Sequence, residues 1–254
     1  MRTLAVIPAR LAATRLPRKP LQLLGGLPLI VRVWQRALSL DVADRVVVAT
    51  DSAEVARAVA GAGGEAVMTR ADHPSGTDRV AEVASLDAFR DFDAILNLQG
   101  DEPFVSADAL RGTLAALRAG GTPLATAATH APSDVLQRPD IVKVVTADDA
   151  RALYFSRAPI PWLRDPSDEA LLTPLVLQHV GVYGYSRSGL RQWVELPPHP
   201  LERVERLEQL RPLAAGMLMR VAIVDEPPQG GIDTPEDLVR ANARWTEHHF
   251  AGRT

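Results

Sequence analysis

The chain has 254 residues, a formal net charge of −3 at pH 7 and no cysteine. This length allows a full hydrophobic core, arranged as one large domain or two small ones. The slightly negative charge argues against a general polyanion binder, and the lack of cysteine excludes disulfides, thiolate metal sites and cysteine nucleophiles.

The first half predicts an alternation of strands and helices. Short apolar runs predict strands at residues 4–7, 45–50, 65–69, 94–98 and 124–129. Helical spacing of apolar residues predicts helices at 30–38, 53–62, 77–88 and 107–119. Such alternation indicates an α/β protein with a parallel sheet, in which ligands lie outside the carboxyl ends of the strands.

The second half has a different pattern. We expect antiparallel strands at 142–145 and 152–156, further strands at 179–185 and 219–224, and helices at 201–215 and 234–247. Residues 157–174 are rich in proline and charge and are expected to form a loop. Because no Gly/Ser linker and no repeat separates the halves, we expect one domain with a β-rich insertion or second lobe.

No segment is expected to enter a membrane. The uncharged, apolar stretch at residues 20–31 is well short of the roughly 20 residues that a membrane helix needs. The apolar run after Met1 is too short for the hydrophobic region of a signal peptide. We therefore expect a cytoplasmic, soluble protein.

The stretch IPARLAATRLPRKP, residues 7–20, carries four cationic side chains directly after the first strand. Cations and closely approaching backbone groups suit phosphates, although neither GxGxxG nor GxxxxGK[ST] occurs here. The alternative is a solvated surface loop that contacts nothing or touches RNA. Its position at a strand end favours phosphate binding.

Two aspartates are candidate ligands for Mg²⁺, which prefers one or two carboxylates together with substrate phosphates. Asp101 lies in the turn QGDEP after a strand, and the alternative there is a simple turn. Asp233 precedes a helix start in which Thr234 caps and Pro235 takes the first position. The alternative is that this stretch only starts the helix.

Two more polar sets are ambiguous by themselves. In HPSGTDR, residues 73–79, hydroxyl and backbone groups could contact a base edge or form an ordinary helix cap. A later set suits a polyhydroxy acid, with Arg157 for a carboxylate and Glu208 and Gln209 for hydroxyls. The alternative is a purely structural role: the tyrosines at 183 and 185 would belong to the core, His179 would be a structural histidine, and Glu208 would lie on the exposed face of a helix.

Taken together, these motifs resemble the 3-deoxy-D-manno-octulosonate (Kdo) cytidylyltransferase family, the CMP-Kdo synthetases. The resemblance runs from residue 4 to about residue 239, through IPARLAATRLPRKPL, ATD, GGEAVMTRADHPSGTDR, NLQGDEP, KVV, ALYFSRAPIPW, HVGVYGY, PLERVERLEQLR and GIDTPEDL. It implies a Rossmann-like nucleotide-diphospho-sugar transferase fold of the glycosyltransferase-A type. That fold has a mainly parallel central sheet and a smaller β-rich lobe for sugar binding and dimerisation.

The resemblance also implies an activity. CTP and Kdo would give CMP-Kdo and diphosphate with Mg²⁺ for lipopolysaccharide biosynthesis, in a homodimer that binds no nucleic acid. The nucleotide-binding core would span about 1–130 and 218–250, and the sugar lobe about 131–217. Departures are slight: Asp78 stands where Glu is frequent, and residues 165–173 match least.

Site residues carried over from the family fall into four sets. The CTP set comprises Ala9, Arg10, Arg15, Lys19, Ser75, Thr77, Arg79, Gln99 and Asp101, and the metal set comprises Asp101 and Asp233. The catalytic set comprises Arg10, Arg15, Lys19, Asp101 and Asp233, and the sugar set comprises Arg157, His179, Tyr185, Glu208 and Gln209.

Two rival functions stay open at this stage. One is a cytidylyltransferase for another acidic sugar, such as a sialic acid or an 8-amino Kdo analogue. The other is a non-catalytic nucleotide- or RNA-binding protein with the same fold. The two retained carboxylates argue against the second rival, because nucleotide binding alone requires neither.

Overall fold

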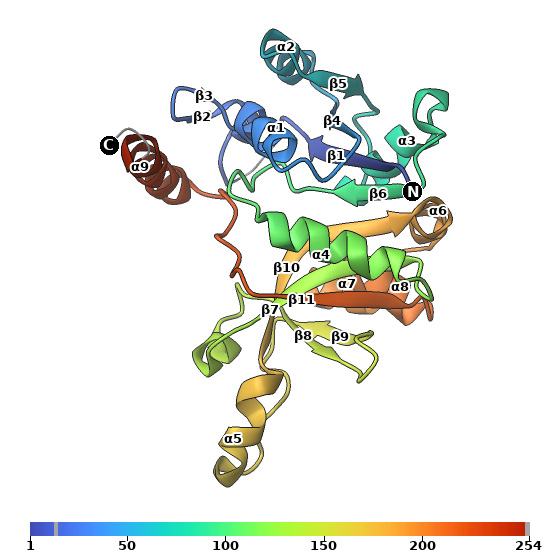
Figure 1. Ribbon diagram of the computed structural model, residues 1–254, viewed down its shortest axis with the longest axis vertical. Helices are drawn as coiled ribbons and strands as arrows, with labels where there is room; N and C mark the ends of the chain where they lie inside the picture. Colours follow the sequence, from blue (N-terminus) through green and yellow to red (C-terminus); the bar gives the residue numbers. More distant parts are fainter. Residues whose placement is uncertain (13–14, 252–254) are drawn as a thin grey trace. The chain divides into compact units, whose positions relative to one another are not determined.

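A computed structural model of the chain describes residues 1–12 and 15–251, the last six of them as helical backbone. The chain divides into two compact units. Unit 1 comprises residues 1–105 and 229–254, and unit 2 comprises residues 106–228. Figure 1 labels the elements of both.

Unit 1 is built on a parallel four-stranded sheet. Its strands are β1 (Thr3–Ala9), β4 (Arg45–Thr50), β5 (Glu65–Met68) and β6 (Ala94–Asn97), in the order β6-β1-β4-β5. In the register, Val6 of β1 pairs with Val47 of β4 and with Asn97 of β6. The helices between these strands are α1 (Leu29–Ser39), α2 (Ala53–Gly61) and α3 (Gly76–Ser85). This part confirms the predicted alternation, because continuous apolar runs are buried on both faces of such a sheet.

Local sequence sets the ends of these helices. The hydroxyls of Ser52 and Ser75 cap α2 and α3 by accepting bonds from backbone N–H groups. Helix α3 ends at Ser85, earlier than predicted, because Leu86 is extended with ψ 142°. One turn of 3-10 helix follows, η2 (Asp87–Phe89).

Unit 1 has further elements besides its central sheet and the helices between the strands. A turn of 3-10 helix, η1 (Lys19–Leu21), precedes an unpredicted hairpin of β2 (Leu23–Leu24) and β3 (Leu27–Pro28). Gly25 and Gly26 form the hairpin turn with φ 54° and 82°, a conformation that favours glycine. Helix α9 (Pro235–Ala251) ends the described chain, and Asn242 binds the hairpin at Gly25 N (2.9 Å) and Leu23 O (3.0 Å).

Unit 2 has a mixed sheet covered by a helix. Strand β7 (Leu124–His130) pairs in parallel with β11 (Met219–Val224) and antiparallel with β10 (Leu177–Ser186). Strand β8 (Lys143–Thr146) pairs antiparallel with β10 and with β9 (Ala152–Ser156), as predicted for residues 142–156. Helix α4 (Ala107–Arg118) packs on β7, β10 and β11. The largest fully buried side chains of unit 2 include Phe155, Tyr185 and Trp193.

Unit 2 differs from the expectations in three places. The helix expected at 201–215 is two helices, α7 (Pro200–Glu205) and α8 (Leu210–Ala214), because Arg206 adopts a left-handed conformation with φ 56°. A further helix, α6 (Arg187–Glu195), begins at the cap Ser186 and was not predicted. The loop expected at 157–174 contains η4 (Pro166–Asp168), α5 (Glu169–Leu172) and the start of η5 (Thr173–Leu175).

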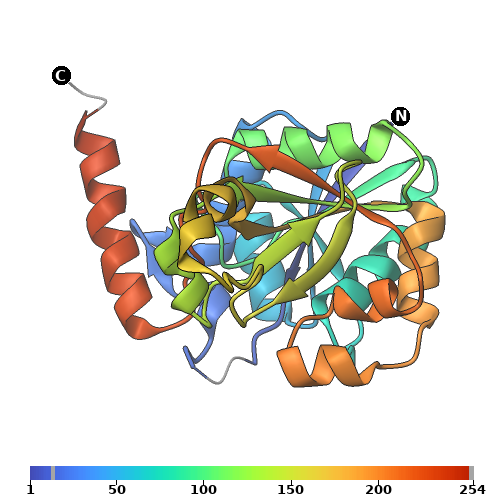
Figure 2. The ribbon, with the colours of Figure 1, turned by 90° about the horizontal axis from the view of Figure 1, so that it is seen from below.

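The segment that carries α5 extends away from the β7–β10 sheet of its own unit (Figure 1), and it lies in front of that sheet in the view from below (Figure 2). It has a small core of its own in which Leu172 and Val176 pack with Val135 and Leu136, the last two from the 3-10 helix η3 (Ser133–Gln137). Local packing therefore orders a stretch whose composition is typical of a loop.

The two units divide the chain at positions other than the expected core and lobe. Helix α4 and strands β7 and β11 belong to unit 2, although residues up to 130 and from 218 were expected in the nucleotide core. The expectation that all of them form a single domain stays a prediction. Among the described residues, no helix has the length and apolar character needed to cross a bilayer.

Candidate active site

A cluster of cations and carboxylates in unit 1 follows the carboxyl ends of β1 and β6. The two strands are neighbours, and the backbone continues their ladder from Leu98 N to Val6 O at 3.1 Å. At Gly100 a Cβ atom would lie 2.7 Å from the carbonyl oxygen of Pro8. Glycine therefore allows the turn that carries Asp101 to approach the start of the basic loop.

Lys19 is the centre of this cluster. Its ammonium donates hydrogen bonds to the Asp101 carboxylate and to Oδ1 of Asp233, the latter at 2.9 Å. Arg15 Nη2 lies 3.0 Å from the other oxygen of Asp233. Burial lowers the pKa of Lys19, but the charge of Asp101 and the bonds to both carboxylates raise it on balance. Lys19 therefore stays cationic, and two cations balance two carboxylates.

Asp233 is held in place by the start of α9. Thr234 caps the helix, as predicted, since its Oγ1 accepts a bond from Asp237 N at 3.2 Å. Asp237 Oδ2 in turn accepts from the backbone N–H groups of Asp233 (3.1 Å) and Thr234 (2.9 Å). The backbone bond from Ile232 N to Asp101 O, at 3.0 Å, joins the segments that carry the two carboxylates.

Glu102 lies close to the charged groups of this cluster, and the sequence analysis did not single it out. Burial, followed by the negative charges of Asp101 and Asp233, raises the pKa of Glu102 to about 7. At neutral pH this carboxyl is therefore partly protonated. Its position in QGDEP could have drawn attention to it, but nothing in the sequence indicates that its side chain is largely shielded from solvent.

The donor set fits a hard divalent cation with substrate oxygens as its further ligands. Asp101 and Asp233 come from distant segments and converge on one ammonium, so a single cation is within reach of both. In the part of the chain that is described, no group of three or more His, Asp or Glu side chains is arranged to hold a metal ion. Two carboxylates are nevertheless what Mg²⁺ uses when phosphates complete its coordination.

The remaining cations of the basic loop differ in their surroundings. Arg10 is exposed and has no polar partner among the described residues, which leave out residues 13 and 14 of this loop. Arg18 binds Glu54 of α2 at 2.5 Å and does not join the cluster. Ala9, at the end of β1, is buried.

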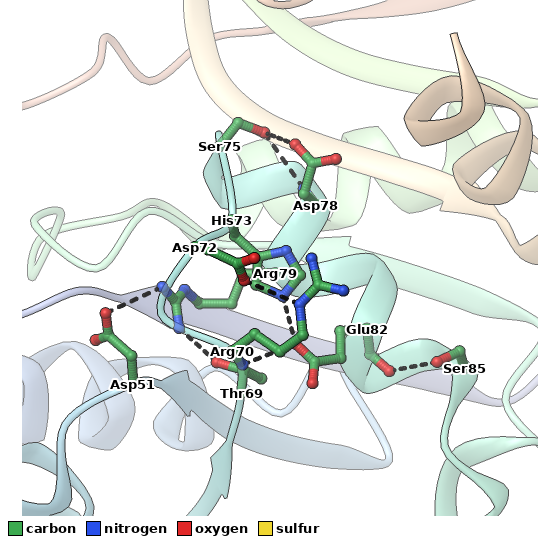
Figure 3. A network of polar contacts seen from close by, with 10 residues as sticks. All are labelled: Asp51, Thr69, Arg70, Asp72, His73, Ser75, Asp78, Arg79, Glu82 and Ser85. Atoms are coloured by element: carbon green, nitrogen blue, oxygen red, sulfur yellow. Dashed lines mark hydrogen bonds and ion pairs between the residues drawn. The ribbon is translucent and has the colours of Figure 1, made fainter.

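A second group of expected CTP contacts lies around the start of α3 (Figure 3). Ser75 Oγ accepts from Asp78 N (3.3 Å) and donates to Asp78 Oδ2 (2.7 Å), so it is an N-cap in this structure. Arg79 is only 4% exposed at its side chain, donates to the Thr69 hydroxyl and pairs with Asp51 at 3.4 Å. Arg79 thus braces α3 against the ends of β4 and β5.

The other two members of the CTP set also lie in unit 1. Thr77, in the first turn of α3, is buried, and Gln99, directly before Gly100, is partly exposed. It stays a prediction that CTP is contacted by Ser75, Thr77, Arg79 and Gln99.

The expected sugar set lies entirely in unit 2, where Arg157 is held by backbone and side-chain contacts. Its Nε donates to the carbonyl of Glu205 at 2.9 Å, and its Nη1 donates to the carbonyl of Pro139 at 3.0 Å. The Glu205 carboxylate accepts from Arg157 N (2.9 Å) and from Ser156 Oγ (2.6 Å). The guanidinium is therefore fixed before any ligand binds, an arrangement suited to a carboxylate.

Lys143 supports the same arginine and was not singled out from the sequence. It is fully buried, and its ammonium donates to three carbonyl oxygens, those of Arg138 (2.9 Å), Ile141 (2.8 Å) and Arg157 (2.6 Å). Burial lowers its pKa. One buried point charge therefore ties the end of β9 to the segment before β8.

The other members of the sugar set differ in exposure. His179 packs edge-on to Phe155, with 5.0 Å between ring centroids, and burial lowers its pKa to about 3, so the ring is neutral at pH 7. Tyr185 is fully buried against Trp193, while Glu208 is partly exposed and Gln209, just before α8, is buried. Their contact with a sugar stays a prediction.

Comparison with known proteins agrees with these motifs. A cytidylyltransferase family model matches residues 4–220. The chain is 63% identical over 251 residues to a 3-deoxy-manno-octulosonate cytidylyltransferase of Gemmatimonas aurantiaca, covering 99% of this chain and 97% of the relative. It is 48% identical over 256 residues to the enzyme of the same name from Methylococcus capsulatus, covering 98% and 97%.

Solved structures similar to this chain also include a cytidylyltransferase for this sugar. CMP:2-keto-3-deoxy-manno-octonic acid synthetase, complexed with CTP, has a TM-score of 0.89 and 39% identity, over 98% of this chain and all of that one. A 4-diphosphocytidyl-2C-methyl-D-erythritol synthase from Anaerococcus prevotii has a TM-score of 0.61 at 15% identity, over 96% and 98%. The second likeness shows the fold alone, and together they confirm the expected fold class. The chain belongs to the cytidylyltransferase family, within which it groups with the 3-deoxy-manno-octulosonate cytidylyltransferases.

Proposed function

We propose that this protein transfers a cytidylyl group from CTP to Kdo and releases diphosphate. The anomeric hydroxyl oxygen of the sugar bonds to the α-phosphorus, the bond from that phosphorus to the diphosphate oxygen breaks, and the hydroxyl proton passes to solvent. The observation that carries the proposal is the cluster in which Lys19 and Arg15 meet Asp101 and Asp233. The full-length identity to named Kdo cytidylyltransferases supports it.

The basic loop supplies the positive charge that this reaction needs. Both substrates are anions, and negative charge builds on the departing diphosphate, so fixed cations lower the barrier. Arg10 is exposed, and Arg15 is 68% exposed at its side chain, so both can meet phosphates directly. Lys19 is oriented by its two aspartates, which reduces the reorganisation needed when phosphates approach.

Asp101 and Asp233 would hold Mg²⁺. When bound, the ion neutralises phosphate charge and acidifies a coordinated hydroxyl. Glu102 is partly protonated near pH 7. The carboxyl therefore adds less negative charge beside the two aspartates and the triphosphate than a fully ionised glutamate would.

The sugar side of the proposal assigns the Kdo carboxylate to Arg157. Its guanidinium is held from two sides by carbonyls, and its backbone oxygen is held by Lys143. A fixed, planar guanidinium can donate two parallel hydrogen bonds to a carboxylate, so it recognises a carboxylate more selectively than a mobile ammonium does. The hydroxyl groups of the sugar would bind the other members of the sugar set.

The proposal extends to the biological setting. The product would serve lipopolysaccharide biosynthesis in the cytoplasm, and the protein would act as a homodimer. Exposed apolar side chains on the segment around α5 support a contact with a second copy, since Trp162 is 72%, Leu171 68% and Leu175 55% exposed. Sedimentation of the wild type and of Leu171→Glu tests this, and a monomeric wild type would contradict it.

A diphosphate-release assay tests the activity. The wild type is incubated with Mg²⁺ and each of CTP, UTP, ATP and GTP, in combination with Kdo, 8-amino Kdo or a sialic acid. We expect CTP with Kdo to give the highest kcat/KM. A higher kcat/KM with another acidic sugar would reassign the substrate, and no diphosphate release with any pair would overturn the proposed reaction.

A further inference from the structure

A buried threonine in unit 2 contacts the histidine of the sugar set. Thr126 of β7 is fully buried. Its hydroxyl oxygen lies 2.7 Å from the carbonyl of Val182, 3.3 Å from that of Val180 and 2.9 Å from His179 Nε2. The β7–β10 register shifts between Val180 and Tyr183, and at this irregularity both carbonyls approach the same hydroxyl.

The single proton of this hydroxyl determines the direction of each bond. An O···O separation of 2.7 Å requires a proton between the two oxygens, so Thr126 donates to Val182. The oxygen therefore presents a lone pair to His179, and Nε2 must be the donor. A neutral imidazole carries one N–H, and burial keeps His179 neutral, so Nδ1 is left with its lone pair.

The opposite tautomer is disfavoured by the same contacts. With the proton on Nδ1, the ring would need the Thr126 proton at Nε2, and the two oxygens of Thr126 and Val182 would then face each other at 2.7 Å with no proton between them. Two unbonded acceptors at this distance in a buried environment repel each other and lack compensation from water.

We infer that Thr126 is a positioning residue that fixes His179 in its Nε2–H tautomer, so that Nδ1 accepts a hydrogen bond from a hydroxyl group of the acid sugar. The inference rests on the proposed function, which places His179 in the sugar set. Among the described residues, none hydrogen-bonds Nδ1, and the ring is flanked by Phe155 and Tyr183. A lone pair repels a carboxylate but accepts from a hydroxyl, so this histidine complements Arg157.

The first test reads the tautomer directly. The full-length wild type is labelled with ¹⁵N-histidine, and two-bond ¹H–¹⁵N spectra are recorded near pH 7.5. The six histidines are distinguished by comparison with His179→Asn. We expect the pattern of an Nε2–H ring at His179, whereas an Nδ1–H pattern or an even mixture would overturn the inference.

The second test uses kinetics with matched variants. Thr126→Val removes the acceptor, so the His179 pattern should become mixed and the KM for Kdo should rise roughly 2- to 10-fold, with the KM for CTP unchanged. Thr126→Ser keeps a hydroxyl and should restore both readouts. Thr129→Val is the control, because Thr129 lies on the same strand, is buried, and bonds to His130 O rather than to His179.

The outcomes separate the inference from the proposed function. An unchanged KM for Kdo in Thr126→Val, or an equal rise in Thr129→Val, would overturn the positioning role. If Thr126→Val does not fold, the inference is tested by the tautomer of His179 in the wild type and in Thr126→Ser. An Nδ1–H pattern in either protein would overturn it. Turnover of Kdo together with an Nδ1–H ring would overturn the inference alone, whereas no turnover of any acid sugar would overturn both.

Discussion

Lys19 shows what sequence reasoning at the residue scale can and cannot give. The basic loop and the two aspartates were predicted as separate groups, cations for phosphates and carboxylates for a metal ion. The structure shows that they are partners, since Lys19 binds both Asp101 and Asp233. Residue types reveal which chemistry is possible, but pairing between positions 19, 101 and 233 depends on tertiary folding that no local pattern contains.

Asp101→Ala should lower kcat by on the order of 100-fold or more while the fold survives. The loss follows because the variant removes one of the two carboxylates proposed to organise phosphate charge. Lys19 would keep its bond to Asp233 at 2.9 Å, so the thermal midpoint should change little. Diphosphate release and thermal unfolding are the measurements. Asp108→Ala, at an exposed aspartate in the first turn of α4, is the control, and near-normal turnover of Asp101→Ala would refute the metal assignment.

Glu102 gives a prediction about pH and stability. Its folded-state pKa of about 7 exceeds the ordinary 4.5, so the folded chain binds more protons than the unfolded chain between these values. The free energy of unfolding should therefore fall as pH rises from about 4.5 to 7, by up to about 3 kcal/mol. In Glu102→Gln this decline should be absent.

Urea unfolding at a series of pH values from 4.5 to 8, in buffer with a chelator, measures this difference. The variant should match the wild type near pH 4.5 and exceed it at pH 8. Parallel curves across the whole range would show that Glu102 does not titrate near neutrality.

At the element scale, periodicity predicted the strands better than the connections. The runs at 45–50, 152–156 and 219–224 coincide with β4, β9 and β11, because buried strands need unbroken apolar stretches. The break between α7 and α8 was missed because amphipathic spacing continues through it. It depends on the backbone of Arg206 alone, and arginine gives no sign of a left-handed conformation.

Replacing Arg206 with glycine should stabilise the protein. A non-glycine residue in the left-handed region costs roughly 1–2 kcal/mol, and glycine's greater freedom in the unfolded chain offsets part of the gain. The expected net gain in the free energy of unfolding is about 0.5–1 kcal/mol.

Arg203→Gly is the matched control for Arg206→Gly. Arg203 is exposed in the last turn of α7 with helical geometry, so glycine there should destabilise the protein by up to about 1 kcal/mol. Chemical denaturation of both variants gives the comparison. A loss of stability in Arg206→Gly as large as that in Arg203→Gly would contradict the argument from φ.

At the scale of the whole molecule, the expected CTP set lies in unit 1 and the expected sugar set lies in unit 2. The sequence predicted an α/β part and a β-rich part, but it placed 106–130 and 218–228 with the nucleotide core. The structure groups those residues with unit 2, since β7 pairs with both β10 and β11, a pairing that chain order does not reveal.

This segregation predicts a clean kinetic split. Arg157→Ala should raise the KM for Kdo roughly 10- to 100-fold, the range expected for losing bonds to a charged group, with the KM for CTP nearly unchanged. Arg10→Ala is the matched arginine removal in unit 1 and should have the reverse effect. Steady-state kinetics with each substrate varied in turn measures both. A change confined to CTP in Arg157→Ala would remove Arg157 from the sugar set.

Lys143 and Lys19 are the only two lysines in a chain with 28 lysine and arginine residues. Both ammonium groups bind several oxygens at once, a task for which a compact tetrahedral donor suits better than a planar guanidinium. Amine acylation followed by mass spectrometry can therefore follow two reporters. Lys143 is fully buried, so its labelling rate measures the opening of unit 2, while labelling of Lys19, 19% exposed at its side chain, measures occupancy of the cation–carboxylate cluster.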